Sequence, residues 1–186
     1  MEGSKSILEQ YLGGTPKERW TIIYENFPNF IRLVDSFMYG IVSDIYMEKT
    51  YNRQFQSDEL GVRVQTNRGN ADPTCKVAMD RATILKAVRT ADFSGGLLSD
   101  TDDAEKHRRN ILLVQTMREE YDTFSKQVEA LRPKDIVFMK PYLMQEKNLV
   151  ELAIEFQIQY DYARLKAYRI NHKMEKEAIK KFRERI

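Results

Sequence analysis

Basic side chains gather at the C-terminal end of the chain and are the first candidates for chemistry. Residues 162–186 contain nine basic and three acidic side chains, a formal charge of +6, whereas the whole chain carries +2. A basic segment at one end of a protein is an electrostatic footprint for phosphate groups. A solvated helical tail has a similar composition, so charge alone leaves both interpretations open.

Side chains for the common catalytic and metal sites are sparse. The chain has one cysteine, Cys75, and two histidines, His107 and His172, which excludes an intrachain disulfide and a thiolate-rich zinc site. Glycine-rich nucleotide-binding motifs and the HExxH zinc motif do not occur in the sequence. We therefore expect no enzyme activity, no cofactor and no metal site.

Two polar features near residue 103 have structural interpretations. A predicted helix is preceded by Asp100, Asp102 and Asp103. We expect these carboxylates to cap the helix and to interact favourably with the positive end of its dipole, rather than to bind a metal. His107 lies one helical turn after Asp103, and this spacing predicts a pair on the helix surface.

Composition favours an ordered, water-soluble protein. Hydrophobic residues make up 42% of the 186 residues, and 30 basic side chains nearly balance 28 acidic ones. Such a chain is neither a polycation that coats nucleic acid unaided nor a disordered segment, because aromatic residues are plentiful and the net charge is low. No apolar run approaches the length of a membrane span, and the first residues lack the apolar core of a signal peptide. We therefore expect no membrane partner and a cytoplasmic location.

Apolar residues recur at helical spacing along most of the chain, which predicts an all-α protein. Thr15, Asp72 and Asn148 are expected N-caps, and a glutamate follows Thr15 at the capping-box position. Residues 52–71 interrupt the periodicity and predict an ordered loop, with a short hairpin near residues 60–66. The expected helices are 4–12, 16–26, one of about six turns from Phe30, 73–93, 104–131, 134–143, 149–156 and one from Tyr160 past Met174.

The helix expected at residues 104–131 carries an apolar seam close to a heptad repeat. Packing against the protein's own core is slightly favoured for this seam, and a dimer interface is the alternative. Its members are Ile111, Val114, Met117, Tyr121, Phe124, Val128 and Leu131.

The last two expected helices, with the three-residue turn 157–159 between them, have the layout of a helix-turn-helix. The small residues Ala153 and Ala163 allow the two helices to cross closely beside the turn. Ala163, Ala167, Ile170 and Met174 share one face of the final helix, which leaves the other faces free to present polar side chains to a DNA major groove.

This segment resembles the C-terminal helix-turn-helix of bacterial sigma factors, region 4. The resemblance is carried by Leu149–Phe156, Ile158, and then Ala163, Arg164, Arg169, Ile170, Lys173 and Met174. More narrowly, the chain is similar to the sigma-region-4-like regulators of phages and integrated elements, the ArpU-type group. The family pattern has Gly where this chain has Gln157, a position that often needs a positive φ, and a capping Ser or Thr where it has Gln159. No sigma region 2 is recognisable, so the resemblance does not imply promoter melting.

The sequence thus predicts a helical N-terminal part, residues 1–103, followed by a DNA-binding module, residues 104–186. The resemblance implies a sequence-specific transcriptional regulator of phage or mobile-element genes that binds double-stranded DNA. A single small module makes few contacts, so useful affinity is expected to need a homodimer or RNA polymerase as partner. The alternative is a helical protein-interaction or phage packaging-type adaptor that does not read DNA sequence.

Two sets of side chains in the module are expected to contact DNA. The base-contact set is Gln159, Tyr160, Asp161, Arg164 and Leu165. The phosphate-contact set is Lys166, Arg169, Lys173 and Lys176. Tyr162 and Tyr168 lie in the same helix, and the alternative interpretation of these two residues is that they are aromatic residues of the core.

Overall fold

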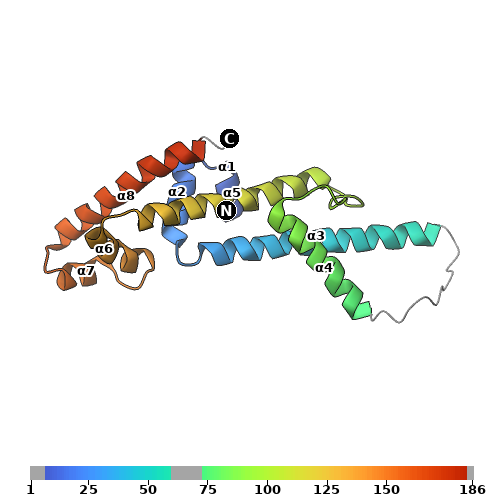
Figure 1. Cartoon of the computed structure of the whole chain (residues 1–186), viewed down its shortest axis with the longest axis horizontal. Helices are drawn as coiled ribbons and strands as arrows, with labels where there is room; N and C mark the ends of the chain where they lie inside the picture. The colour runs from blue at the N-terminus through green and yellow to red at the C-terminus, as the bar shows by residue number, and fades with distance from the viewer. Residues whose placement is uncertain (1–6, 60–72, 184–186) are drawn as a thin grey trace, which may run out of the picture. The chain divides into compact units, whose positions relative to one another are not determined.

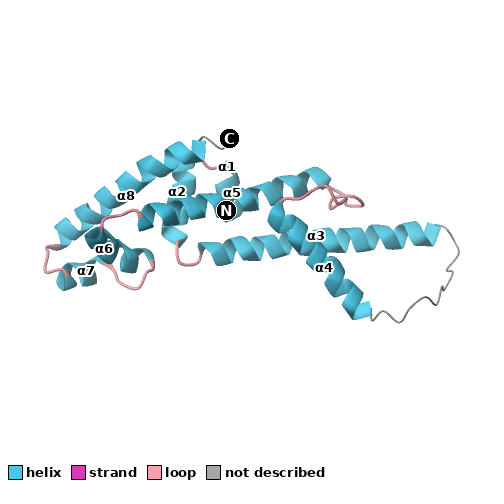
Figure 2. Ribbon diagram, viewed as in Figure 1, coloured by secondary structure: helices cyan, strands magenta, loops and turns pink. Residues whose placement is uncertain are grey.

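Every regular element in the described part of the chain is a helix (Figures 1 and 2). The structure, a computed structural model, describes residues 7–59 and 73–183. The helices are α1 (Ile7–Gly13), α2 (Pro16–Asn26), α3 (Phe30–Glu59), α4 (Pro73–Thr90), α5 (Ala104–Glu129), α6 (Pro133–Leu143), α7 (Leu149–Glu155) and α8 (Tyr160–Arg183). The prediction of an all-α protein is confirmed for these residues.

Capping boxes begin α2 and α7. The Thr15 hydroxyl accepts a hydrogen bond from the backbone N–H of Glu18, and the Glu18 carboxylate accepts one from the N–H of Thr15. Asn148 and Glu151 make the same reciprocal pair at the start of α7. These bonds satisfy backbone donors that a helix leaves without intrahelical partners. They also lower the pKa of the Glu18 carboxyl, because its charged form accepts the Thr15 hydrogen bonds.

The chain forms two compact units, which are described separately. The terminal unit combines residues up to Arg32 with those from Arg118 onward, and the middle unit is Leu33–Met117. The division therefore falls inside α3 and α5. It does not coincide with the expected boundary between residues 103 and 104, because α2 packs against α8 within the terminal unit (Figure 1).

An aromatic cluster forms the centre of the terminal unit. Trp20 of α2 packs with its ring centroid 4.3 Å from that of Phe124 in α5 and 6.4 Å from that of Phe182 in α8. Its indole N–H donates a hydrogen bond to the Asn171 side chain of α8 over 3.1 Å. One side chain of α2 thus joins three helices.

A buried polar cluster links α1, α2 and α5 in the same unit. The Tyr11 hydroxyl donates to Oε2 of Glu120 over 2.5 Å, and Nη2 of Arg19 lies 3.0 Å from Oε1 of the same carboxylate. All three residues are buried, Glu120 with 1% of its surface exposed. Burial and the neighbouring carboxylate raise the pKa of Tyr11, so its hydroxyl stays protonated as the donor. No local sequence pattern predicts this cluster, because its three residues lie up to 109 positions apart.

The middle unit is held by apolar packing and by polar contacts at helix ends. Val88 of α4 and Val114 of α5 are fully buried in its core. The Gln115 side chain donates to the backbone carbonyls of Val88 and Arg89, over 3.0 and 2.9 Å. It therefore satisfies acceptors that the last turn of α4 leaves open.

His107 departs from the sequence expectation. It is buried in the middle unit, with 4% of its surface exposed, and its Nε2 lies 2.9 Å from a carboxylate oxygen of Glu48 in α3. The predicted surface pair with Asp103 is wrong. Asp103 instead caps α5, since its carboxylate accepts from the backbone N–H of Lys106 over 2.9 Å.

Helix α3 is longer than the sequence indicates. The loop expected at 52–71 is wrong for residues 52–59, which continue α3, while residues 60–72, with the expected hairpin and the Asp72 cap, lie outside the described residues. The Asn52 side chain donates to the Asp100 carbonyl and the Asp102 carboxylate. Tertiary contacts of this kind support a helix whose local apolar pattern has ended.

The apolar seam of α5 packs inside the chain. Ile111, Val114 and Met117 are fully buried in the middle unit, and Phe124 is fully buried in the terminal unit. This burial agrees with the favoured interpretation of the seam as core. A dimer formed through the seam would have to take these side chains out of the core.

Among the described residues, no helix is both long and apolar enough to cross a membrane.

We predict that Glu120→Gln lowers the free energy of unfolding by about 3 kcal/mol, because it leaves the buried Arg19 guanidinium without its counter-charge. Urea denaturation of the full chain measures the change. Glu129→Gln, at the exposed end of α5, is the matched control and should stay within about 0.5 kcal/mol of the parent. Equal stability of the two variants would contradict the role given to the cluster.

Candidate nucleic-acid interface

A tight turn joins α7 to α8. Beyond the last residue of α7, Gln157 has φ of 50°, and its N–H donates to the Ile154 carbonyl over 3.1 Å. The N–H of Ile158 donates to the Ala153 carbonyl over 2.9 Å. This pair of bonds is the Schellman ending of a helix, which places its left-handed residue at the position where glycine is most common. The expectation that residue 157 is a position of positive φ is confirmed.

One face of α8 is buried along its whole length. Its first half packs small residues against α7, where Leu152 and Ala153 are also buried. The side chains of this face are Ala163, Ala167, Ile170, Met174, Ala178 and Phe182. The first four are those that the sequence spacing placed together.

The predicted base-contact residues lie at the start of α8, away from that buried face. Gln159, Tyr160, Asp161, Arg164 and Leu165 are all exposed. Arg169, Lys173 and Lys176, which were predicted to contact phosphates, are exposed as well. Accessibility is a requirement for DNA contact, and the contacts themselves stay predictions.

Lys166 has a different environment from the other predicted phosphate contacts. It is half-buried, and its ammonium lies 4.3 Å from the ring centroid of Phe138 in α6 and 5.3 Å from that of Phe156. The two rings pack edge to face with centroids 5.4 Å apart. A cation over aromatic faces is attracted by their quadrupoles. Lys166 therefore helps to hold α8 on α6 and the end of α7.

Two tyrosines of α8 lie on the surface rather than in the core. Tyr162 is 55% exposed and Tyr168 62% exposed, so the core interpretation is wrong for both. The ring of Tyr168 stacks on that of His172, with centroids 5.8 Å apart and planes 11° apart. The i, i+4 spacing of the two rings is a signal that sequence reading could have used.

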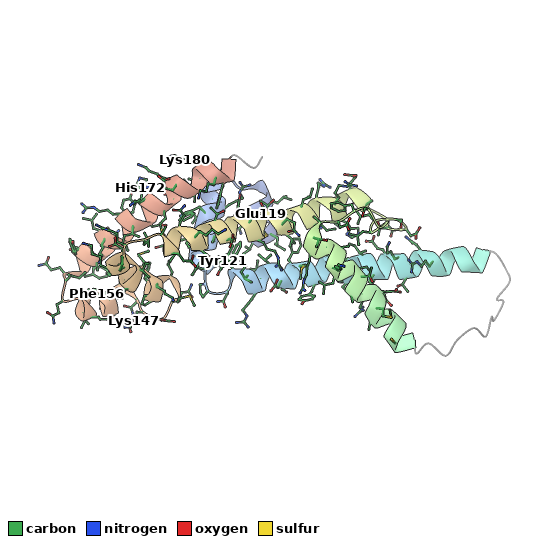
Figure 3. The ribbon with its side chains drawn as sticks, viewed as in Figure 1. Glu119, Tyr121, Lys147, Phe156, His172 and Lys180 are labelled. Atoms are coloured by element: carbon green, nitrogen blue, oxygen red, sulfur yellow. The ribbon has the colours of Figure 1, made fainter. Side chains whose placement is uncertain are left out.

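Three carboxylates near α8 make local contacts. The ammonium of Lys147, which is labelled in Figure 3, donates a hydrogen bond to Glu155 of α7 over 2.8 Å, and Glu151 caps its own helix. On α8, Glu175 lies 3.3 Å from Nδ1 of His172. The Lys147 ammonium offsets the charge of Glu155, while the exposed carboxylate of Asp161 leaves a negative charge in the first turn of α8.

The N-cap and first turn of α6 also contribute basic side chains, which the sequence patterns did not single out. Arg132 and Lys134 line a pocket together with Lys166 and Arg169 of α8. The two pairs are more than 30 residues apart in the chain, so only the fold brings them together.

Among the described residues, no group of histidine, cysteine, aspartate and glutamate side chains is arranged to hold a metal ion.

No family model, no curated protein and no solved structure matches this chain. The resemblance of residues 149–174 to sigma region 4 therefore stays a prediction from the sequence.

We predict that Gln157→Gly raises the free energy of unfolding by about 0.5–1 kcal/mol, because glycine adopts positive φ without the steric cost that a Cβ brings. Gln127→Gly, inside α5, is the matched control and should cost roughly 1 kcal/mol. Both values come from denaturant unfolding. A destabilised Gln157→Gly would mean that the turn does not have this backbone conformation.

Proposed function

We propose that the chain is a sequence-specific DNA-binding regulator of transcription, with α7 and α8 as its helix-turn-helix. The observation that carries the proposal is the division of α8 into two faces. Its small side chains pack on α7, while the side chains suited to base edges are exposed in its first two turns. An α-helix fits the major groove, where every base pair presents a distinct pattern of donors and acceptors.

The charge of α8 supports DNA as the partner. Arg169, Lys173 and Lys176 are exposed beyond the base-contact set, and lysine and arginine contacts to phosphates supply the sequence-independent part of the affinity. Lys173 follows Arg164 by nine residues, about 13 Å along the helix axis. We therefore assign Arg164 to base reading and Lys173 to the phosphate backbone.

The resemblance to sigma region 4 supports a place in transcription and adds RNA polymerase as a candidate partner. We propose that the genes it regulates belong to a phage or mobile element, as in the ArpU-type group. The proposed role is promoter recognition without promoter melting, because no sigma region 2 is recognisable. A DNA partner implies a cytoplasmic location.

A second candidate function is that of a helical protein adaptor. Val150 and Ile154, one turn apart on α7, are 54% and 74% exposed. Paired exposed aliphatic residues are suited to a protein contact, as an interaction or packaging adaptor would need. Sequence-selective DNA binding separates the two candidates, because an adaptor of this kind does not require it.

We predict that Arg164→Ala weakens the binding free energy by about 1–3 kcal/mol for a duplex that the parent protein selects from a random-sequence pool. The variant should also lose its preference at one base pair. Lys173→Ala should weaken selected and random duplexes alike and lower the slope of log affinity against log salt by about one. Fluorescence anisotropy with labelled duplexes measures both effects.

Thermal unfolding of each variant serves as the control for folding. If Arg164→Ala folds normally and binds every duplex as the parent does, α8 does not read sequence. The adaptor function would then be preferred.

A further inference from the structure

Four basic side chains converge on one small pocket beside α8. The pocket has a volume of about 240 Å³ and lies between the first turn of α6 and the first three turns of α8. Arg132 is the N-cap of α6 and Lys134 lies in its first turn, while Lys166 and Arg169 come from α8. Among the described residues, Asp135 is the one carboxylate that lines the pocket. The four basic groups and this carboxylate together give the lining a formal charge of +3.

The single carboxylate of the pocket is already engaged. Asp135 is buried, and its Oδ2 lies 2.7 Å from Nε of Arg132, which orients the guanidinium at the entrance to α6. Lys166 is held over the rings of Phe138 and Phe156, where its charge is stabilised but not cancelled. Cations held together in this way repel one another, and an anion in the pocket would relieve the repulsion.

A phosphate group suits this lining better than a carboxylate does. Arginine guanidinium groups match the oxygen geometry of phosphate, and lysine ammonium groups add point charge. The exposed Tyr162, which also lines the pocket, adds a hydroxyl that can donate a further hydrogen bond.

The position of the pocket favours a phosphate of DNA over free phosphate. Arg169 follows Arg164 by five residues, about 7.5 Å along the axis of α8 and about 140° around it, so Arg169 lies on a flank of the helix that faces a groove wall when Arg164 faces the bases. A duplex whose major groove receives the start of α8 therefore brings its backbone close to the pocket.

We propose that this pocket binds a backbone phosphate of the DNA that α8 reads, so that α6 becomes part of the interface. This inference rests on the proposed function and adds Arg132 and Lys134 to its phosphate contacts. Phosphate contacts of this kind fix the position of a protein on the duplex and do not select sequence.

The test compares Lys134→Ala and Arg169→Ala with Lys140→Ala in the full chain. Lys140 is an exposed lysine of α6 outside the pocket and is the matched control. Each pocket variant should lower the slope of log affinity against log salt by about one, equally for selected and random duplexes, and the double variant by about two. Lys140→Ala should keep the parent slope. Thermal unfolding checks that each variant folds.

Three outcomes would overturn the inference, and they differ in what they say about the proposed function. If the parent selects a duplex but Lys134→Ala keeps the parent slope, the pocket does not bind DNA and the proposed function stands. If inorganic phosphate raises the thermal midpoint of the parent but not of Lys134→Ala, and the slope is again unchanged, the pocket holds free phosphate instead. If the parent retains no duplex at all, both the proposed function and the inference fail.

Discussion

The buried carboxylate of Glu120 is the constraint on which the terminal unit depends. A charge removed from water is tolerated only when partners satisfy it, and here Tyr11 and Arg19 do so from α1 and α2. Arg19 is followed directly by Trp20, whose ring packs on α5 and α8. The placement of α2 that satisfies Glu120 is therefore also the one that holds α8.

This attachment divides α8 into two parts with different surroundings. Its second half is held by α2, through Trp20 with Asn171 and Phe182. Its first half contacts α7 and α6, through Ala163 and through Lys166 over the two phenylalanine rings. A helix anchored at one half and exposed on the outer face of the other can present side chains in a fixed orientation. Preorganisation of this kind lowers the entropic cost of binding a rigid duplex.

Features that depend on neighbouring residues in sequence were predictable. The capping boxes at Thr15 and Asn148 follow from residue type within a few positions, and the positive φ of Gln157 follows from the glycine that the sigma region 4 pattern has there. The buried face of α8 follows from helical spacing, because Ala163, Ala167 and their partners recur every three or four residues. The exposed start of α8 is the complement of that face.

Features that depend on distant residues were not predictable from these patterns. His107 contacts Glu48, which lies 59 residues away in the sequence, and Tyr11 donates a hydrogen bond to Glu120, which lies 109 residues away. Asn52, where the local apolar pattern of α3 has ended, makes its contacts with Asp100 and Asp102. The pocket beside α8 likewise depends on Arg132 and Lys134 at the start of α6. Nothing in their local sequence indicates that the fold places them next to Lys166 and Arg169.

Nuclear magnetic resonance mapping of a selected duplex onto the full chain tests the central claim most directly. The account predicts that backbone amide shifts change at Arg164, Arg169 and Lys134, while those of Val88 and Val114 in the middle unit stay unchanged. Changes confined to Val150 and Ile154 or to the middle unit, with none in the first half of α8, would contradict it.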